Sequence, residues 1–243
     1  MAVIEINNFK KSFGTKQVHD GVNFTVNKGE CLGLVGGSGA GKSVILRSLI
    51  GLEKADAGSI LINSVDITHM SENDLVEIRK KVAYVFQNGA LFDSMTVFDN
   101  LAYSLRAHTK MTYDQMDKKI SDQVDAFGLL SAKKLYPSEL SGGMQKRVGL
   151  ARAIMMDPDV ILYDEPTAGL DPYNTLKIQE LILRLKAKKV TSILVTHDMP
   201  TGIAVCDRFV FLQNKVISEN GTTQELLAQP NSLVNQFIKG QIV

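Results

Sequence analysis

The sequence contains the stretch Gly36-Gly37-Ser38-Gly39-Ala40-Gly41-Lys42-Ser43. It follows an apolar segment, residues 30–35, that predicts a buried strand, and it precedes apolar residues at helical spacing. A strand, a glycine-rich loop and a helix in this order are typical of a phosphate-binding loop. The glycines let successive backbone N–H groups turn toward one anion, and the start of the helix adds its positive end.

The loop predicts a nucleotide with Mg²⁺. We expect the Lys42 ammonium to reach the β- and γ-phosphates and the Ser43 hydroxyl to be a ligand of the metal. The residues expected to bind around the phosphates are Gly36, Gly37, Ser38, Gly39, Ala40, Gly41, Lys42, Ser43 and Val44.

A second apolar strand, residues 160–163, ends in two adjacent carboxylates, Asp164 and Glu165. Buried strands rarely end in two acids without a partner cation. Asp164 fits the role of a Mg²⁺ partner, through water. Glu165 lies one residue further on and points elsewhere, so it fits the role of the base that orients an attacking water.

The surrounding pattern predicts an α/β fold. Strands are predicted at residues 3–6, 22–26, 59–62, 82–86 and 191–195, and residues 97–156 show helical patterns only. The two buried strands at 160–163 and 191–195 are joined by a helix, which indicates a parallel sheet. We expect Asp171 to cap that helix and Ser71 to cap another. A hairpin around residues 213–214 and two short helices near 222–229 and 231–239 complete the prediction.

A second anion-binding helix start is predicted at Leu140-Ser141-Gly142-Gly143-Met144, which precedes an apolar helix. One phosphate group does not need two such sites from one chain. We therefore expect Ser141, Gly142 and Gly143 to contact a nucleotide bound to another copy of the chain.

The order of these motifs resembles the ATP-binding cassette family: the phosphate loop, Gln87, the Leu-Ser-Gly-Gly-Met stretch, Asp164-Glu165, residues 168–171 and His197. The resemblance covers essentially the whole chain. It implies an ATPase that uses ATP and Mg²⁺ and works as a homodimer. It also implies that Phe13 stacks on adenine and that His197 contacts the γ-phosphate.

The same resemblance gives roles to two more residues. Gln87 would touch Mg²⁺ and the attacking water and would sense a membrane partner. Asp171 would lie at the seam between two copies. Met144 departs from the family, which commonly carries Gln there, and this exchange leaves the ribose contacts across the interface open.

The fold implied by the resemblance is a P-loop NTPase of the ABC ATPase type. It has a RecA-like parallel-sheet core, an N-terminal antiparallel β subdomain and a helical subdomain. We expect residues 1–243 to form one nucleotide-binding domain. Residues 1–87 and 157–243 would form its catalytic lobe, and residues 88–156 would form the helical subdomain that carries Ser141.

Three stretches narrow the resemblance to the ATPases of Mce-associated lipid transporters: residues 87–92, residues 95–100 and residues 137–139. The implied function is to power phospholipid movement between the inner and outer membranes and so maintain outer-membrane lipid asymmetry. The implied partners are an integral-membrane permease, an Mce-domain protein and a small STAS-domain subunit. The chain ends soon after residues 236–240, so we do not expect a long C-terminal tail that clasps a neighbouring subunit.

The composition and the sequence pattern argue against several other classes of protein. The net charge of +1 gives no field for nucleic acid, so no nucleic-acid partner is expected. No stretch approaches the roughly 20 apolar residues of a membrane helix, and no signal peptide is visible. Any membrane role must therefore work through a partner, and the transporter resemblance implies a peripheral protein bound through the permease at the cytoplasmic face of a bacterial inner membrane. Cys31 and Cys206 are predicted to be reduced thiols, not zinc ligands or a disulfide.

Three alternatives remain open. The first is the ATPase of an amino-acid, peptide or metal importer, which would share every catalytic residue named above. The second is a soluble cassette protein of DNA repair or the ribosome. The gap of about fifty residues between Gln87 and Leu140 has no room for a long coiled-coil insert. The third is a small-molecule kinase, which has no use for the Leu-Ser-Gly-Gly-Met stretch.

Overall fold

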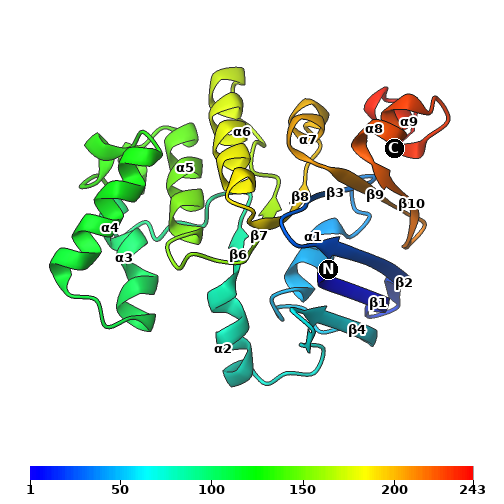
Figure 1. Cartoon of the computed structure of the whole chain (residues 1–243), viewed down its shortest axis with the longest axis horizontal. Helices are drawn as coiled ribbons and strands as arrows, with labels where there is room; N and C mark the ends of the chain where they lie inside the picture. The colour runs from blue at the N-terminus through cyan, green and yellow to red at the C-terminus, as the bar shows by residue number, and fades with distance from the viewer. Residues whose placement is uncertain (243) are drawn as a thin grey trace.

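A computed structural model describes residues 1–242, in which the strands form two sheets (Figure 1). The antiparallel sheet has the order β2-β1-β4-β5 and the larger sheet the order β10-β9-β3-β8-β7-β6. The strands of the first are β1 (Ala2–Phe13), β2 (Lys16–Asn27), β4 (Ala57–Ile62) and β5 (Val65–Asp66). Those of the second are β3 (Cys31–Val35), β6 (Val82–Val85), β7 (Val160–Asp164), β8 (Thr191–Val195), β9 (Arg208–Gln213) and β10 (Val216–Thr222).

The larger sheet is parallel except at one edge. Strands β6, β7, β8, β3 and β9 pair in parallel, and β10 pairs with β9 as an antiparallel hairpin. The central strands β3 and β8 are buried on both faces, which explains the apolar sequence of β3 and of residues 193–195 in β8. The predicted parallel sheet and the closing hairpin are thus confirmed, with Asn214 and Lys215 in the turn.

The helices join these strands and cover the larger sheet. They are α1 (Lys42–Ser48), α2 (Glu72–Lys81), α3 (Val97–His108), α4 (Tyr113–Ala126), α5 (Gly142–Ala153), α6 (Pro172–Ala187), α7 (Met199–Val205), α8 (Thr223–Ala228) and α9 (Leu233–Ile238), with short turns η1 (Leu130–Ala132) and η2 (Pro137–Glu139). Ser71 and Asp171 accept hydrogen bonds from the first turns of α2 and α6, as predicted. Helix α7 is an element that the sequence pattern did not reveal.

Residues between β6 and β7 form helices and turns only, which confirms the predicted helical segment. Figure 1 shows α3, α4 and α5 gathered at one end of the molecule, with the antiparallel sheet at the other end. Each of these helices contributes to one hydrophobic cluster, in which Leu101, Val124 and Val148 are fully buried. This cluster continues onto one face of the larger sheet.

The side-chain alternation of the larger sheet separates two cores. In β7, Ile161 and Tyr163 belong to the cluster on the helical face, whereas Val160 and Leu162 belong to a second cluster. That second cluster also contains residues of β1, β2, β4 and α1, so the antiparallel sheet and α1 cover the other face. Burial on both faces keeps the strand ends in fixed relative positions.

The parallel strands bring four chain segments to one edge. The carboxyl ends of β3, β6, β7 and β8 lead directly into the glycine loop, Gln87, Glu165 and the segment at His197. In parallel sheets, ligands bind at this edge. Residues that are more than 150 positions apart in sequence therefore meet at one site.

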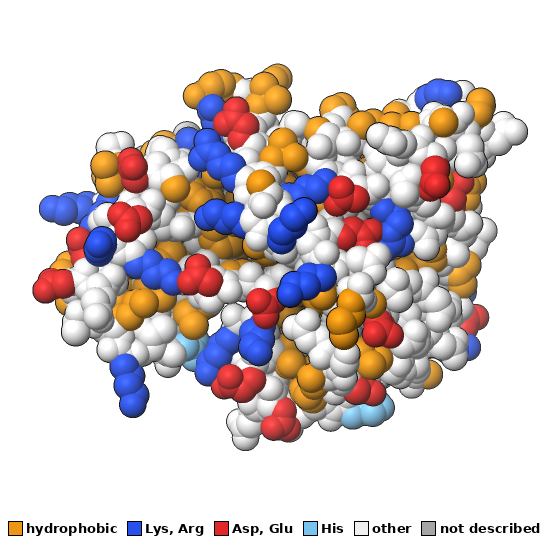
Figure 2. Space-filling model, viewed as in Figure 1, with side chains coloured by type: hydrophobic (Ala, Val, Ile, Leu, Met, Phe, Trp, Pro, Cys, Tyr) orange, Lys and Arg blue, Asp and Glu red, His pale blue; other side chains and the backbone are white. Residues whose placement is uncertain are grey.

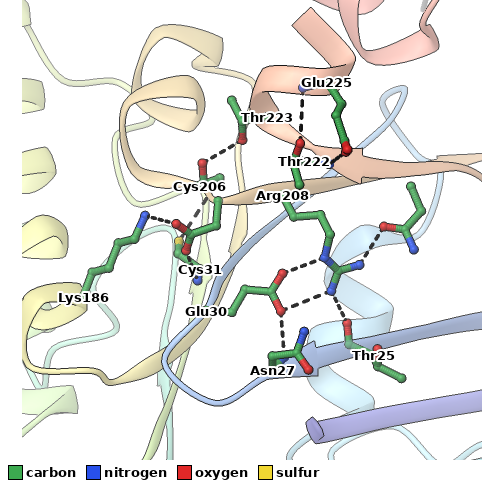
Figure 3. Close-up of polar contacts among 12 residues, drawn as sticks. Thr25, Asn27, Glu30, Cys31, Lys186, Cys206, Arg208, Thr222, Thr223 and Glu225 are labelled. Atoms are coloured by element: carbon green, nitrogen blue, oxygen red, sulfur yellow. Dashed lines mark hydrogen bonds and ion pairs between the residues drawn. The ribbon is translucent and has the colours of Figure 1, made fainter. Parts of the chain in front are cut away.

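The opposite end of β3 is fixed by polar contacts (Figure 3). Arg208 Nε donates to Glu30 Oε1 at 2.6 Å, and an Arg208 Nη2 donates to the carbonyl of Thr25. Cys31 and Cys206 are buried free thiols whose sulfur atoms lie 3.9 Å apart. This distance exceeds a disulfide bond of about 2.05 Å, so the two sulfur atoms are not bonded to each other in this structure, although the two residues, far apart in sequence, are neighbours in space.

No helix within residues 1–242 combines the length and the apolar character needed to cross a bilayer.

Candidate functional site

The glycine loop turns sharply between β3 and α1. Gly36, Gly39 and Gly41 have φ values of 149°, 73° and 99°, which side-chain-bearing residues rarely adopt. At Gly36 a Cβ atom would also lie 2.3 Å from the carbonyl oxygen of Leu212 in β9. The loop therefore needs glycine for both its torsion angles and its close packing on the sheet.

Lys42 lies across this loop. Its Nζ donates hydrogen bonds to the carbonyls of Gly36 at 2.7 Å and Gly37 at 2.9 Å. Burial lowers the pKa of Lys42, while the negative charges of Glu165 and Asp164 partly oppose that shift. The Lys42 ammonium has thus lost part of its hydration. A bound phosphate anion would compensate for this loss.

Asp164 at the end of β7 is bound by two hydroxyl groups. Ser43 donates to Oδ1 at 2.8 Å, and Tyr84 of β6 donates to Oδ2 at 2.7 Å. Burial and this hydrogen bond to a carboxylate raise the pKa of Tyr84, so its hydroxyl remains a donor. The first turn of α1 and the ends of strands β6 and β7 are therefore linked through the Asp164 carboxylate.

Glu165 and His197 form a second pair beside the loop. Glu165 has a φ of 51°, and its N–H donates to the carbonyl of Val195. Its Oε2 accepts the backbone N–H of His197 at 3.1 Å, and its Oε1 lies 3.4 Å from His197 Nε2. Burial raises the pKa of Glu165, an effect that the His197 N–H partly offsets. A carboxylate with a raised pKa suits proton transfer near neutral pH.

A cavity of about 1040 Å³ joins these groups. Its lining contains most of the predicted nucleotide-binding residues together with Gln87, Glu165 and His197. The predicted residues that line it are Phe13, Ser38, Gly39, Gly41, Lys42, Ser43, Val44, Gln87, Glu165 and His197. Gly36, Gly37, Ala40 and Asp164 lie in the adjoining loop and strand end and do not line it. The Phe13 side chain is 45% exposed at this cavity, so a planar base could stack on it.

The structure does not place Ser141, Gly142 or Gly143 in this cavity. Ser141 caps α5 by accepting the N–H of Met144 at 3.3 Å, and both Ser141 and Gly142 are exposed. Gly143 is buried, and a Cβ atom there would lie 2.3 Å from the Asn174 side chain of α6. Two of these three residues are therefore free to meet another molecule.

Sequence reasoning missed several residues of the site. Tyr84 is the most informative, since it is 80 positions from the Asp164 carboxylate to which it donates. The pairing of Tyr84 with Leu162 in neighbouring parallel strands is the signal that could have found it. Other cavity-lining residues that the motifs did not indicate include Lys16, Arg47, Thr167, Thr175 and Asp198.

A metal at this site would need ligands from outside the chain. Within residues 1–242 no cluster of three or more His, Cys, Asp or Glu side chains could hold an ion. Ser43 and Asp164 offer hard oxygen atoms that suit Mg²⁺ bound together with phosphate oxygens and water.

Comparison with known proteins agrees with this geometry. A family model described as "ABC transporter" matches residues 19–168. The "Intermembrane phospholipid transport system ATP-binding protein MlaF" of Haemophilus influenzae is 39% identical over 98% of this chain and 91% of its own. The "Probable ribonucleotide transport ATP-binding protein mkl" of Mycobacterium tuberculosis H37Rv is 41% identical over 98% of this chain and 67% of its own.

Solved structures match equally well. The dimeric ATP-binding cassette MJ0796 bound to ADP and phosphate has a TM-score of 0.84 at 27% identity, covering 90% of this chain and 98% of that one. The cbiO1 protein of Clostridium perfringens has a TM-score of 0.85 at 25% identity, covering 98% and 95%. With the glycine loop, the carboxylate pair and the shared cavity, these matches show that the chain belongs to the ATP-hydrolysing subunits of ABC transporters.

Proposed function

We propose that this chain is the ATPase of an ABC transporter that moves phospholipids between the inner and outer membranes, as the Mla system does. The convergence of Lys42, Ser43 and the Glu165–His197 pair on one cavity, with Asp164 hydrogen-bonded to Ser43 beside it, carries the ATPase part. The similarity to MlaF over nearly the whole chain supports the assignment of phospholipid as the cargo. The membrane function that the family resemblance implies for such a transporter is the maintenance of outer-membrane lipid asymmetry.

ATP would lie between β1 and the glycine loop. The Phe13 ring stacks on adenine, and Lys42 with the backbone N–H groups of the loop binds the β- and γ-phosphates. Ser43, Asp164 and Gln87 hold Mg²⁺. When bound, Mg²⁺ supplies positive charge next to the phosphate oxygens.

Glu165 orients the attacking water for displacement of ADP from the γ-phosphorus. His197 contacts the γ-phosphate and, through its backbone N–H, holds Glu165 Oε2 in place. Lys42 and the loop N–H groups stabilise the negative charge that spreads over the phosphate oxygens. Proton handling by a placed carboxylate is worth about 10²–10⁴ in rate.

The second half of the site comes from a second copy. In the proposed homodimer, Ser141, Gly142 and Gly143 of one copy reach the γ-phosphate on the other, and Asp171 lies at the seam. The exposure of Ser141 and Gly142 outside their own cavity supports this arrangement. The match to a cassette solved as a dimer with ADP and phosphate also supports it. In this view, residues 1–87 and 157–243 form the catalytic lobe, and residues 88–156 form the helical subdomain.

A groove beside Gln87 fits the permease. A second cavity of about 350 Å³ lies between α2, β6, α3 and α5, and its lining includes Phe86, Val76 and Met156. The Phe86 side chain is 38% exposed, and Phe92 and Tyr103 nearby are 40% and 52% exposed. An apolar segment of a membrane partner that binds here would move with the Gln87 loop.

The partners proposed from the MlaF similarity are an MlaE-like permease, an MlaD-like Mce-domain protein and an MlaB-like STAS-domain subunit. The chain would then lie at the cytoplasmic face of the bacterial inner membrane, bound through the permease. No nucleic-acid partner is proposed.

The name of the mycobacterial relative gives a second candidate cargo, ribonucleotides. Both candidates can be tested on the complex that co-purifies with the tagged chain from its native host. Bound phospholipid, and ATPase activity that rises with phospholipid vesicles, would support the lipid assignment. Stimulation by ribonucleosides and ribonucleoside monophosphates, with no response to vesicles, would contradict it. A complex that contains Lys42→Ala is the control, because it should carry the same cargo without hydrolysis.

A further inference from the structure

His19 in β2 is a buried histidine that the catalytic scheme above does not use. Its side chain has no exposed surface, and its ring packs against Phe9 with 5.4 Å between the ring centroids. Burial lowers the pKa of His19, which favours the neutral ring in the folded protein. A neutral imidazole in an apolar core is costly unless its polar atoms find partners.

One polar atom of this ring contacts the phosphate loop. His19 Nε2 lies 3.2 Å from the carbonyl oxygen of Gly41. A carbonyl can only accept, so Nε2 carries the hydrogen and Nδ1 does not. Nδ1 is buried and has no hydrogen-bond partner among residues 1–242. The ring thus keeps one satisfied nitrogen, and that nitrogen donates to the loop.

Gly41 is the residue at which the loop becomes a helix. It caps α1 with a φ of 99°, and its carbonyl also accepts the N–H groups of Val44 at 2.9 Å and Ile45 at 3.2 Å. A Cβ atom at this position would lie 2.6 Å from His19 Cε1. The His19 side chain of strand β2 therefore lies in close contact with the backbone at Gly41, directly before Lys42 and Ser43.

We propose that His19 is a positioning residue for the phosphate loop. Its Nε2–H fixes the Gly41 carbonyl so that the following N–H groups, the Lys42 ammonium and the Ser43 hydroxyl are directed at the phosphates. His19 does not line the nucleotide cavity, so it acts through Gly41 and not by contact with ATP. The proposal depends on ATP binding at this loop.

Two substitutions separate the hydrogen bond from simple core packing. His19→Leu fills the apolar space but has no donor, whereas His19→Gln keeps an N–H₂ donor near the position of Nε2. We expect His19→Leu to weaken binding of ATP with Mg²⁺ about threefold to tenfold, the effect of one hydrogen bond, and His19→Gln to stay within about twofold of wild type. Calorimetric titration measures both. The reverse order, with Leu normal and Gln impaired, would show a packing role and overturn the proposal.

A second ligand shows where the effect arises. His19→Leu should weaken inorganic tripolyphosphate and ATP by the same factor, since only the phosphates meet the loop. Phe13→Ala is the matched control: it should weaken ATP and leave tripolyphosphate unchanged. If His19→Leu weakens ATP alone, His19 acts through the β1–β2 hairpin and the proposal is wrong. Loss of tripolyphosphate binding in Lys42→Ala separately confirms that the loop binds phosphate.

The wild-type chain offers a test that needs no variant. Long-range ¹H–¹⁵N spectra of the histidine rings report which nitrogen carries hydrogen. We expect His19 as the neutral Nε2–H form, with its ring signals shifted when ATP binds. A neutral Nδ1–H form or a charged ring would remove the donor to Gly41 and overturn the proposal.

Discussion

Asp164 and Glu165 are consecutive acids with different surroundings. Asp164 accepts hydrogen bonds from the hydroxyls of Ser43 and Tyr84, whereas Glu165 accepts the backbone N–H of His197 and has a pKa raised by burial. The left-handed backbone of Glu165 separates the directions of the two side chains. One carboxylate can therefore serve the metal while the other serves the water.

The raised pKa of Glu165 has a consequence for stability. A carboxyl group whose folded pKa lies above its usual 4.5 binds more protons in the folded than in the unfolded state, so its ionisation destabilises the fold as pH rises between those two values. We expect ligand-free Glu165→Gln to melt at a higher temperature than wild type at neutral pH, with a gap that narrows as pH falls toward 4.5. Calorimetric scans across this range measure it. Glu180→Gln, exposed on α6, is the control, and a gap that widens on acidification would contradict the assignment.

Glu165→Gln should also stop turnover without loss of ATP. Gln cannot take up a proton, so we expect kcat to fall by about 10²–10⁴ while the ATP dissociation constant stays close to wild type. Phosphate release and equilibrium titration measure the two quantities. Hydrolysis at the wild-type rate would show that another group orients the water.

Tyr84 tests the geometry around Asp164. Tyr84→Phe keeps the ring, which packs 4.3 Å from Phe86 between centroids, and removes the hydroxyl that donates to Asp164 Oδ2. We expect kcat/KM for ATP with Mg²⁺ to fall about fivefold, in the range of one lost hydrogen bond. Steady-state kinetics at varied Mg²⁺ measure it. Tyr113→Phe, 62% exposed on α4, should change nothing; equal kinetics in both variants would rule out a role for the Tyr84 hydroxyl.

At the scale of elements, the glycine loop and strand β9 fit together as one unit. Gly36→Ala places a methyl group 2.3 Å from the Leu212 carbonyl at a φ of 149°, whereas Gly39→Ala meets no atom within 4 Å at a φ of 73°. We expect Gly39→Ala to cost about 1–2 kcal/mol of unfolding free energy from backbone strain alone. Gly36→Ala should cost more than about 3 kcal/mol, because overpacking adds to the strain. Urea unfolding of both variants measures the two losses of unfolding free energy. Equal losses would show that the contact with β9 is unimportant.

The sequence predicted the elements whose signals are local. The apolar strands β3, β7 and β8, the loop at Gly36 and the caps Ser71 and Asp171 all follow from short patterns. Contacts between segments that are distant in sequence could not be predicted from the sequence. Tyr84 contacts Asp164, His19 contacts Gly41 and Cys31 contacts Cys206 only because the fold brings distant segments of the chain together. Helix α7 was not predicted because Met199–Val205 is short and contains Pro200 and Gly202.

At the scale of the whole molecule, the catalytic cavity and the Ser141 segment occupy different parts of one chain. The cavity lies at the carboxyl edge of the parallel strands. Ser141 caps helix α5, which Figure 1 shows in the helical part with α3 and α4. Figure 2 shows basic and acidic side chains mixed over one face of the molecule, with no large area of a single sign. The net charge of the chain is only +1, so we expect no strong long-range electrostatic force between two copies. In the proposed homodimer, the bound nucleotide supplies the contact that joins them.

Ser141→Asp tests this contact without unfolding α5, because Asp is as good a helix cap as Ser. Its negative charge would repel the γ-phosphate bound to the other copy. In a Glu165→Gln background with ATP and Mg²⁺, we expect Ser141→Asp to remain monomeric in light scattering while the monomer binds ATP with unchanged affinity. Ser131→Asp, an exposed serine in η1 of the same helical part, should dimerise normally. If Ser141→Asp dimerises as well as Ser131→Asp, or if its monomer loses ATP affinity, Ser141 does not act on a nucleotide held by a second copy.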